Sequence, residues 1–365
     1  MAMDQAGAHP ADASPARAGT RFNSIVIGVA GTLVALIAMR QFADLIGPLF
    51  LALNLMITAY PVHTWLVRKG TPSWLSAVAV ALTVFAVLIA MVVGFIWAVN
   101  EMVGLLTDYG DEFNKLYEQV LALAAQFDFN TDAIGGLVGS IDPNSILGAA
   151  SSLLSGASGL VAMLGVVIAA LVFMAMDTPG MEARMRRLAS NRASIAHAMG
   201  IFAAGVRRYW LVTTIFGIIV AILDGIALAI MGVPLAVVWA LFSFLTNYIP
   251  NIGFVVGLVP PALVALFAKG WQAAVLVIVI YSVLNFVVQS IIQPRFTGES
   301  VGVTPTVSFI SLLLWTGVIG GMGTLLALPL TLLVKALVID VDPRTRWVNA
   351  LIASDPADAD EPHET

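Results

Sequence analysis

The sequence predicts an all-α polytopic membrane protein, and three observations support this fold class. First, 59% of the 365 residues are hydrophobic and 11% are charged, whereas soluble domains carry about 25% charged residues. Second, several apolar runs reach about 18 residues or more, the length with which a helix crosses a bilayer. Third, these runs are continuous and do not alternate with a period of two, which argues against membrane-spanning strands. We expect about six full spans plus two interrupted helical hairpins in the C-terminal half, or eight spans.

The N-terminal part is predicted to contain three spans. Residues 1–21 lack the basic n-region of a signal peptide and are expected to form a disordered cytoplasmic tail. Residues 22–99 then hold spans at Phe22–Met39, Leu45–Tyr60 and about Trp74–Val99. The short link between the first two spans predicts a tight helical hairpin. Pro61 is expected to end the second span, because proline removes a helical hydrogen bond.

Residues 100–152 are predicted to form an extracytoplasmic amphipathic region. The segment 100–144 is acidic, with Lys115 as its one basic residue. Apolar side chains at three- and four-residue spacing between Leu105 and Leu123 predict an amphipathic helix. Its apolar face packs on neighbouring helices or the membrane surface, or else it forms a lid over a ligand. Asp142 followed by Pro143 predicts the start of the helix that leads into the fourth span.

Residues 153–209 are predicted to hold the fourth span, about Leu153–Met176, and a cytoplasmic amphipathic helix. Arginines dominate the segment 177–209, and positively charged loops stay in the cytoplasm. Together with the other basic residues near the spans, this places both termini on the cytoplasmic side of a bacterial inner membrane. Residues 341–365 then form an acidic cytoplasmic tail. Membrane orientation alone explains the arginines, and binding of anionic lipid headgroups is the alternative.

Residues 210–340 are predicted to form the transport domain. It consists of the span Trp210–Met231, the apolar stretch Pro234–Phe267, the span Trp271–Ile292 and the apolar stretch Val303–Val338. The first stretch is interrupted at Asn247–Gly253 and the second around Gly320–Gly323, where proline and glycine favour a break in the helix. This order of elements is typical of the inverted repeats of secondary transporters with discontinuous helices.

The two interrupted stretches admit two interpretations. On the first, each stretch is re-entrant, one from outside and one from the cytoplasm, so that both tips lie near mid-membrane and line a pathway. On the second, each stretch crosses as one kinked helix, or its break marks a turn outside the membrane. The candidate pathway residues are Asn247, Pro250, Asn251, Gly253, Asn285, Gln289, Gly320, Gly321 and Gly323.

Uncharged polar side chains gather near the first break. Asn285 and Gln289 are one helical turn apart and therefore share a face of their span. With Asn247, Asn251 and Gln293 they offer donors and acceptors that suit a small polyol or a furanone. Hydrogen bonding between helices is the alternative use of these side chains.

Asp224 is the candidate for ion coupling. It lies in the middle of the span Trp210–Met231, where a charge costs at least about 2.5 kcal/mol. Binding of a proton or of sodium would remove that cost and could bias a two-state carrier. The alternative is a neutral carboxyl group that makes a structural hydrogen bond to a neighbouring helix, with Asn247 or Thr246 as the expected partner.

Other chemistry is disfavoured by what the sequence lacks. It has no cysteine, so it offers neither disulfides nor thiolate metal sites, and its four histidines lie outside the predicted spans. It has no GxxxxGK[ST] motif for binding ATP phosphates. The net charge is −5 and no basic stripe is present, which argues against nucleic-acid binding. We expect no cofactor, no metal and no enzymatic activity.

A run of proline and glycine motifs carries a family resemblance over about residues 22–340. The motifs are Tyr248-Ile249-Pro250-Asn251-Ile252-Gly253, Gln293-Pro294-Arg295-Phe296-Thr297-Gly298, Val301-Gly302-Val303-Thr304-Pro305, Gly320 to Gly323, and Ala327-Leu328-Pro329. In this order they resemble the autoinducer-2 exporter family of permease-M-like proteins. The resemblance implies a multi-span transporter, because members are linked to export of the quorum-sensing furanone autoinducer-2 and, in others, to sodium/proton antiport.

The sequence therefore predicts a secondary exporter of a small polar organic molecule that works by alternating access. A sodium/proton antiporter is the second hypothesis. A membrane scaffold or channel subunit is the third, and in that case the glycines at the breaks serve helix packing. The expected partners are the lipid bilayer, a small-molecule or ion substrate, and further copies of the chain in a homo-oligomer.

Overall fold

The structure is a computed structural model that describes residues 15–108, 148, 157–249, 252–293, 304–342, 345 and 348–352. Its elements in these ranges are α1 (Pro15–Gln41), α2 (Ala43–Arg68), α3 (Ser73–Asp108), α7 (Ala157–Asn191), α8 (Ala193–Ile230), α9 (Ala236–Thr246), α10 (Gly253–Lys269), α11 (Trp271–Asn285), the π-helix η1 (Phe286–Ile292), α13 (Pro305–Ile319), α14 (Gly321–Lys335), the π-helix η2 (Ala336–Asp340) and α15 (Asn349–Ile352). All of them are helices.

Within the described ranges, six helices are long and apolar enough to cross a membrane, which confirms the all-α polytopic class. They are Ala43–Arg68, Ser73–Gly104, Val161–Asn191, Ala193–Ile230, Trp271–Gln289 and Gly321–Asp340. The predicted first span lies in α1, whose apolar part Val26–Gln41 is a shorter helix. The last of the six is the second half of an interrupted stretch, α14 together with η2, and its 20 residues are enough to cross a membrane.

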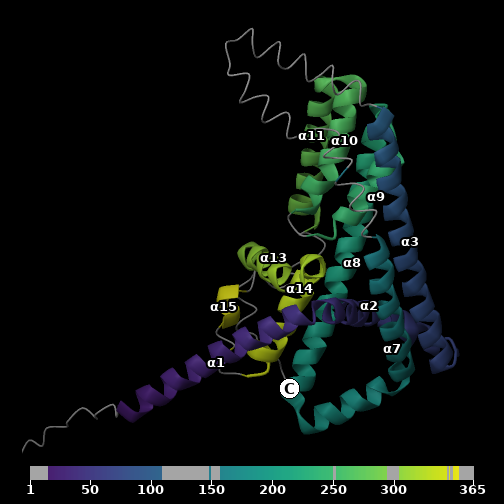
Figure 1. The fold of residues 1–365 in the computed structure, drawn as a ribbon. Coiled ribbons are helices and arrows are strands. Elements are labelled where there is room, and N and C mark those ends of the chain that lie inside the picture. The colour runs from purple at the N-terminus through teal and green to yellow at the C-terminus, as the bar shows by residue number, and fades with distance from the viewer. Residues whose placement is uncertain are drawn as a thin grey trace, which may run out of the picture.

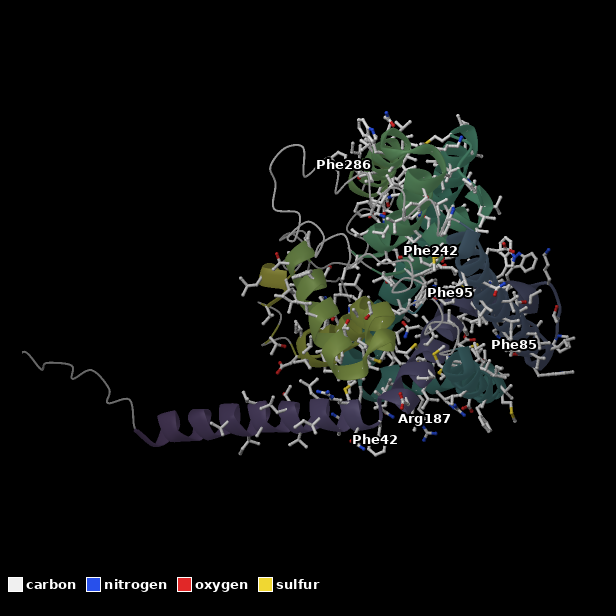
Figure 2. The ribbon with its side chains drawn as sticks, turned by 45° about the horizontal axis from the view of Figure 1, so that its top comes forward. Phe42, Phe85, Phe95, Arg187, Phe242 and Phe286 are labelled. Carbon is white, nitrogen blue, oxygen red and sulfur yellow. The ribbon has the colours of Figure 1, made fainter. Side chains whose placement is uncertain are left out.

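The N-terminal helices differ from their prediction in two ways. α1 begins at Pro15, inside the stretch predicted as a tail, because proline is favoured in the first turn of a helix. The predicted hairpin between the first two spans is wrong. Figures 1 and 2 show α1 leading away from the bundle instead of back along α2. The chain changes direction at Phe42, which has non-helical backbone angles.

The prediction that Pro61 ends its helix is also wrong, because α2 continues through this proline to Arg68. A proline at position 61 cannot donate to the carbonyl of Ile57, four residues earlier. The side chain of Arg207 supplies the missing donor, since its Nε lies 3.5 Å from the Ile57 oxygen. A residue of α8 therefore satisfies the carbonyl group that the proline leaves unpaired.

α3, α7 and α8 extend beyond the spans predicted for them. α3 continues past Val99 to Asp108. Most of the predicted amphipathic region lies outside the described residues, and so does Asp142-Pro143, the predicted start of the helix that leads into the fourth span. α7 contains Pro179 and runs through the arginine-rich segment to Asn191. The predicted cytoplasmic helix is divided between α7 and α8, because Arg192 adopts an extended backbone that separates them.

α8 is the central element of the fold (Figure 1). It has 38 residues, which corresponds to about 57 Å. Along its N-terminal half, Phe202, Val206 and Trp210 belong to a buried cluster with side chains of α2, α7, α13 and α14. Near its C-terminal end, Leu228 belongs to a second buried cluster with side chains of α9, α10 and α11. The two interrupted stretches thus pack along different halves of one helix.

Candidate functional site

The first interrupted stretch forms a helical hairpin, called hairpin 1, made of α9, residues 247–252 and α10. This confirms the predicted break. The two arms are in such close contact that a Cβ atom at Gly253 would overlap the carbonyl oxygen of Thr246. Gly257, one turn later, faces the Oγ1 of Thr246 and the backbone of Ser243. Glycine at these two positions therefore allows α10 to pack directly on α9.

Both ends of hairpin 1 lie near the C-terminal end of α8. α9 runs antiparallel to α8, because a Cβ at Gly225 would lie 2.8 Å from that of Ala240, and one at Gly217 would lie 3.0 Å from Nδ2 of Asn247. At the other end of the hairpin, a Cβ at Gly232 would lie 2.8 Å from Nζ of Lys269. The turn of hairpin 1 is thus beside Gly217, about 20 Å along α8 from its C-terminal end.

A chain of amide groups lies at the turn of hairpin 1. Nε2 of Gln289 donates hydrogen bonds of 2.9 Å to Oδ1 of Asn247 and of 2.9 Å to Oδ1 of Asn285. Nδ2 of Asn285 donates to the carbonyl of Tyr281 at 2.9 Å. Three of the five predicted amides are therefore brought together from the end of α9, from α11 and from η1. Gln289 lies within a π-helix, a distortion that is frequent at functional sites.

Tyr248 anchors the same turn, and sequence reasoning missed it. Its hydroxyl group shares a hydrogen bond of 2.9 Å with Oγ1 of Thr214 on α8. Its ring lies 5.7 Å from that of Trp210 and 5.4 Å from that of Phe244. Earlier in α9, Phe242 stacks on Phe95 of α3 with ring centroids 6.4 Å apart. Both residues are labelled in Figure 2. The aromatic residue within the segment Asn247-Tyr248-Ile249-Pro250 was the available signal.

The second interrupted stretch forms hairpin 2, made of α13, Gly320 and α14. Gly320 has a φ of +67°, in the left-handed region that favours glycine. A Cβ at Gly323 would overlap the carbonyl oxygen of Trp315, whereas one at Gly321 would meet no atom within 4 Å. A Cβ at Gly205 on α8 would lie 3.3 Å from Leu332. Hairpin 2 therefore packs along the N-terminal half of α8.

The predicted site residues divide into three groups. Asn247, Asn285 and Gln289 form one polar cluster, with Gly253 at the start of the next helix. The glycines of hairpin 2 form a separate turn, which is linked to hairpin 1 through the buried cluster that contains both Tyr248 and Ile319. Pro250 and Asn251 lie outside the described residues.

Asp224 is fully buried and lies at the interface of α8 and α9. Its Oδ2 accepts a hydrogen bond of 2.6 Å from Oγ of Ser243. The expected partners were Asn247 or Thr246, and this expectation was wrong. The antiparallel packing brings Ser243 to the level of Asp224, while Thr246 donates to carbonyl groups of its own helix.

An apolar cavity of about 370 Å³ lies elsewhere, between α3 and α7. Its lining includes Trp74, Phe85, Leu171 and Pro179, and none of the predicted pathway residues takes part. Among the described residues, no group of three or more His, Cys, Asp or Glu side chains is placed to hold a metal ion. The apolar cavity is thus separate from the amide cluster of hairpin 1.

Hairpin 2 has an internal hydrogen-bond chain that gives a testable prediction. Thr331 accepts from Nε1 of Trp315 at 2.9 Å and donates to Oγ of Ser311 at 2.8 Å. Thr331→Val keeps the shape but leaves the indole N–H unpaired, so we expect a loss of about 1–3 kcal/mol in the free energy of unfolding. Thr83→Val is the control, because the exposed Thr83 bonds only to a carbonyl of its own helix. Equal effects of the two changes in chemical denaturation would contradict the prediction.

Comparison with known proteins gives consistent matches over most of the chain. A family described as AI-2E family transporter matches residues 25–341. The putative transport protein YhhT of Escherichia coli K12 is 30% identical over 316 residues, which cover 85% of this chain and 89% of that protein. The AI-2 transport protein TqsA of the same organism is 28% identical over 312 residues, 85% of this chain and 90% of its own length. A putative transport protein of Haemophilus influenzae is 27% identical over 339 residues, 88% of this chain and 93% of that protein.

Proposed function

Because the chain belongs to the AI-2E family of transporters, we propose that it is a secondary exporter of a small polar organic molecule of the autoinducer-2 type. Membership confirms the resemblance drawn from the proline and glycine motifs and makes the chain a multi-pass membrane transport protein. The choice of substrate is supported by the relative that is named an AI-2 transport protein. The direction of transport is part of the proposal.

The observation that carries the proposal is the amide cluster at the turn of hairpin 1. Amide side chains both donate and accept hydrogen bonds without carrying charge, which suits a molecule rich in hydroxyl and carbonyl groups. Asn247 and Gln289 are partly buried, so the cluster is screened from bulk water while part of its polar surface stays reachable. A substrate hydroxyl group can replace the bond between these two side chains at little cost, because one hydrogen bond is exchanged for another.

The geometry of hairpin 1 supports a re-entrant position in the membrane. Its arms have 11 and 17 residues, about 16 and 26 Å, whereas the hydrocarbon core is about 30 Å thick. Both of its ends lie beside one end of α8, and its turn lies beside the apolar middle of that helix. Non-helical backbone at such a depth is tolerated where it lines a cavity or is covered by protein. We place the pathway at this turn.

The proposed setting is the bacterial inner membrane with both termini in the cytoplasm, as the arginine-rich segment predicts. The homo-oligomer stays a prediction. A sodium/proton antiporter is the second candidate function, and the observation that favours it is the buried carboxyl group of Asp224. A scaffold without transport activity is the outcome if neither flux is found.

Replacement of Gln289 tests the proposal. Gln289→Leu removes both hydrogen bonds from the amide cluster, and we expect autoinducer-2 flux in proteoliposomes to fall roughly tenfold, the effect of about one lost hydrogen bond. The control is Gln272→Leu, because Gln272 is an exposed amide in the first turn of α11, the helix that leads into η1. Its flux should equal that of the unmodified protein.

Three results would count against the exporter. If Gln289→Leu transports autoinducer-2 at the rate of the unmodified protein, the amide cluster is not part of the pathway. Sodium flux coupled to protons without autoinducer-2 flux would favour the antiporter. Reconstituted, folded protein that moves neither substrate would favour the scaffold.

A further inference from the structure

Two buried polar atoms lack a hydrogen-bond partner at the centre of the second buried cluster. They are Oδ1 of Asp224 and the hydroxyl oxygen of Tyr281. Asp224 is 0% exposed and Tyr281 is 1% exposed, and the two side chains are close enough to interact electrostatically. An unpaired polar atom is costly in such buried surroundings, because it has given up the hydrogen bonds that it makes to water in the unfolded chain. Two of them together indicate a group that binds there.

Among the described residues, the helices that pack around Asp224 offer no cation to balance a carboxylate. α9 contains no titratable side chain, and α11 contributes only Tyr281. Lys269 is the one such residue of α10, and its Nζ lies beside Gly232, about two turns along α8 from Asp224. The titratable residues of α3 are Glu101 and Asp108, both acidic. None of the ion pairs in the described residues involves Asp224.

We propose that Asp224, Ser243 and Tyr281 form a proton-binding site that controls how closely hairpin 1 packs on α8. The proton is carried by Oδ1, because Oδ2 already accepts the hydrogen bond from Ser243. The step is a proton transfer between water and the carboxyl group, with no other bond made or broken. The inference rests on the proposed function, since a proton-linked movement of hairpin 1 has its use in a transporter.

Close packing of hairpin 1 requires the neutral carboxyl group. Gly225 follows Asp224, and its missing side chain lets α9 approach until Ala240 is in contact with α8. This closely packed interface has room for a neutral acid that is bonded to Ser243, and among the described residues no cation lies beside it to balance a charged one. Loss of the proton therefore favours separation of α9 from α8, which would admit water to the carboxylate.

The connections of hairpin 1 are suited to such a movement. Gly232 and Leu235 lead into α9 with φ values of +65° and +59°, and Gly270 leads out of α10 with a φ of +90°. A leucine in the left-handed region is strained. Trp239 stabilises this conformation of the connection, because its Nε1 donates to the carbonyl of Pro234 at 2.9 Å. Both connections therefore have backbone conformations that can change when the packing is released.

Infrared spectroscopy of the full-length protein in lipid tests the proton site directly. The chain has 22 Asp and Glu residues, and each absorbs as a carboxylic acid when it is protonated. We therefore expect the difference between the low-pH and high-pH spectra to contain one protonated carboxyl component that Asp224→Asn lacks. Asp177→Asn is the control, because Asp177 is exposed and paired with Arg184, so this variant should keep that component. A spectrum of Asp224→Asn identical to that of the unmodified protein would overturn the assignment.

Cysteine labelling tests the movement, since the chain has no cysteine of its own. Ala240→Cys reports on the face of α9 that contacts α8. Val237→Cys is the reference, because position 237 lies on the same helix and is 74% exposed; its labelling rate shows how the reactivity of an accessible thiol itself changes with pH. We expect the labelling rate at position 240, divided by that at 237, to rise several-fold with pH, and to stay constant when Asp224→Asn is added.

The proposal fails if this ratio is independent of pH in the Asp224 protein, or if it rises equally with Asp224→Asn. Neither measurement uses a transported substrate. A working exporter can therefore fail both tests, and a protein that exports nothing can pass them, so failure of this inference is distinguishable from failure of the proposed function.

Discussion

Gly323→Ala is expected to prevent hairpin 2 from closing and to abolish accumulation of folded protein. The new Cβ would overlap the carbonyl oxygen of Trp315, which is backbone and cannot turn away. Relief requires the two arms to separate, which breaks the bond between Thr316 and Thr324 at 2.9 Å and exposes the buried Trp315. Disruption of the packing around Trp315 together with loss of this hydrogen bond is expected to exceed the roughly 4 kcal/mol that marks exceptional point mutants.

Gly321→Ala is the matched control for this prediction. Gly321 lies two residues away in the same turn, and an added Cβ there would meet no atom within 4 Å. We expect this variant to accumulate and to elute as folded protein in size-exclusion chromatography. Gly253→Ala should behave like Gly323→Ala, because its Cβ would overlap the carbonyl of Thr246. Two results would contradict the packing described for hairpin 2. One is folded Gly323→Ala protein, and the other is an equal loss of folded protein in Gly321→Ala and Gly323→Ala.

Asp340→Leu is expected to lower the free energy of unfolding by about 3–5 kcal/mol, the cost of leaving a buried charge without its partner. Nζ of Lys335 lies 3.1 and 3.2 Å from the two carboxylate oxygens of Asp340, and their side chains are 16% and 8% exposed. The π-helix η2 brings residues five positions apart onto one face. Asn349 of α15 also donates to Asp340, at 3.2 Å.

The double variant Lys335→Met with Asp340→Leu separates the unpaired charge from other effects. Replacement of both partners by apolar side chains of similar size is often neutral or stabilising, so we expect it to regain most of the stability lost in Asp340→Leu. Chemical denaturation in detergent micelles is the measurement. A double variant as unstable as Asp340→Leu would show that packing or the contact with Asn349 matters more than the charge.

The features that the sequence predicted well are those fixed by local chemistry. Long apolar runs identified the spans, and Asn247–Gly253 and Gly320–Gly323 marked the two breaks, because these residues disfavour a helix wherever they occur. Asn285 and Gln289 were expected to share a face, and the structure confirms this. Their contact with Asn247 depends on how α9 and α11 pack, and the sequence suggested only that the three amides serve together.

The features that were missed depend on residues far apart in the chain. The register of α9 on α8 decides that Ser243, and not Thr246, reaches Asp224. The path of α1 depends on a single residue, Phe42, which carries no strong turn signal. The bond between Trp315 and Thr331 forms because hairpin 2 closes. Periodicity within a helix contains no information about these arrangements.

The contact between Arg207 and the Ile57 carbonyl links the evolution of two distant positions. Proline at 61 is tolerated within α2 because a donor from α8 is at hand. Loss of that donor would make the proline harmful, and loss of the proline would free the arginine to vary. Mutations at these two sites should therefore show epistasis, so that a change at one site alters the effect of a change at the other.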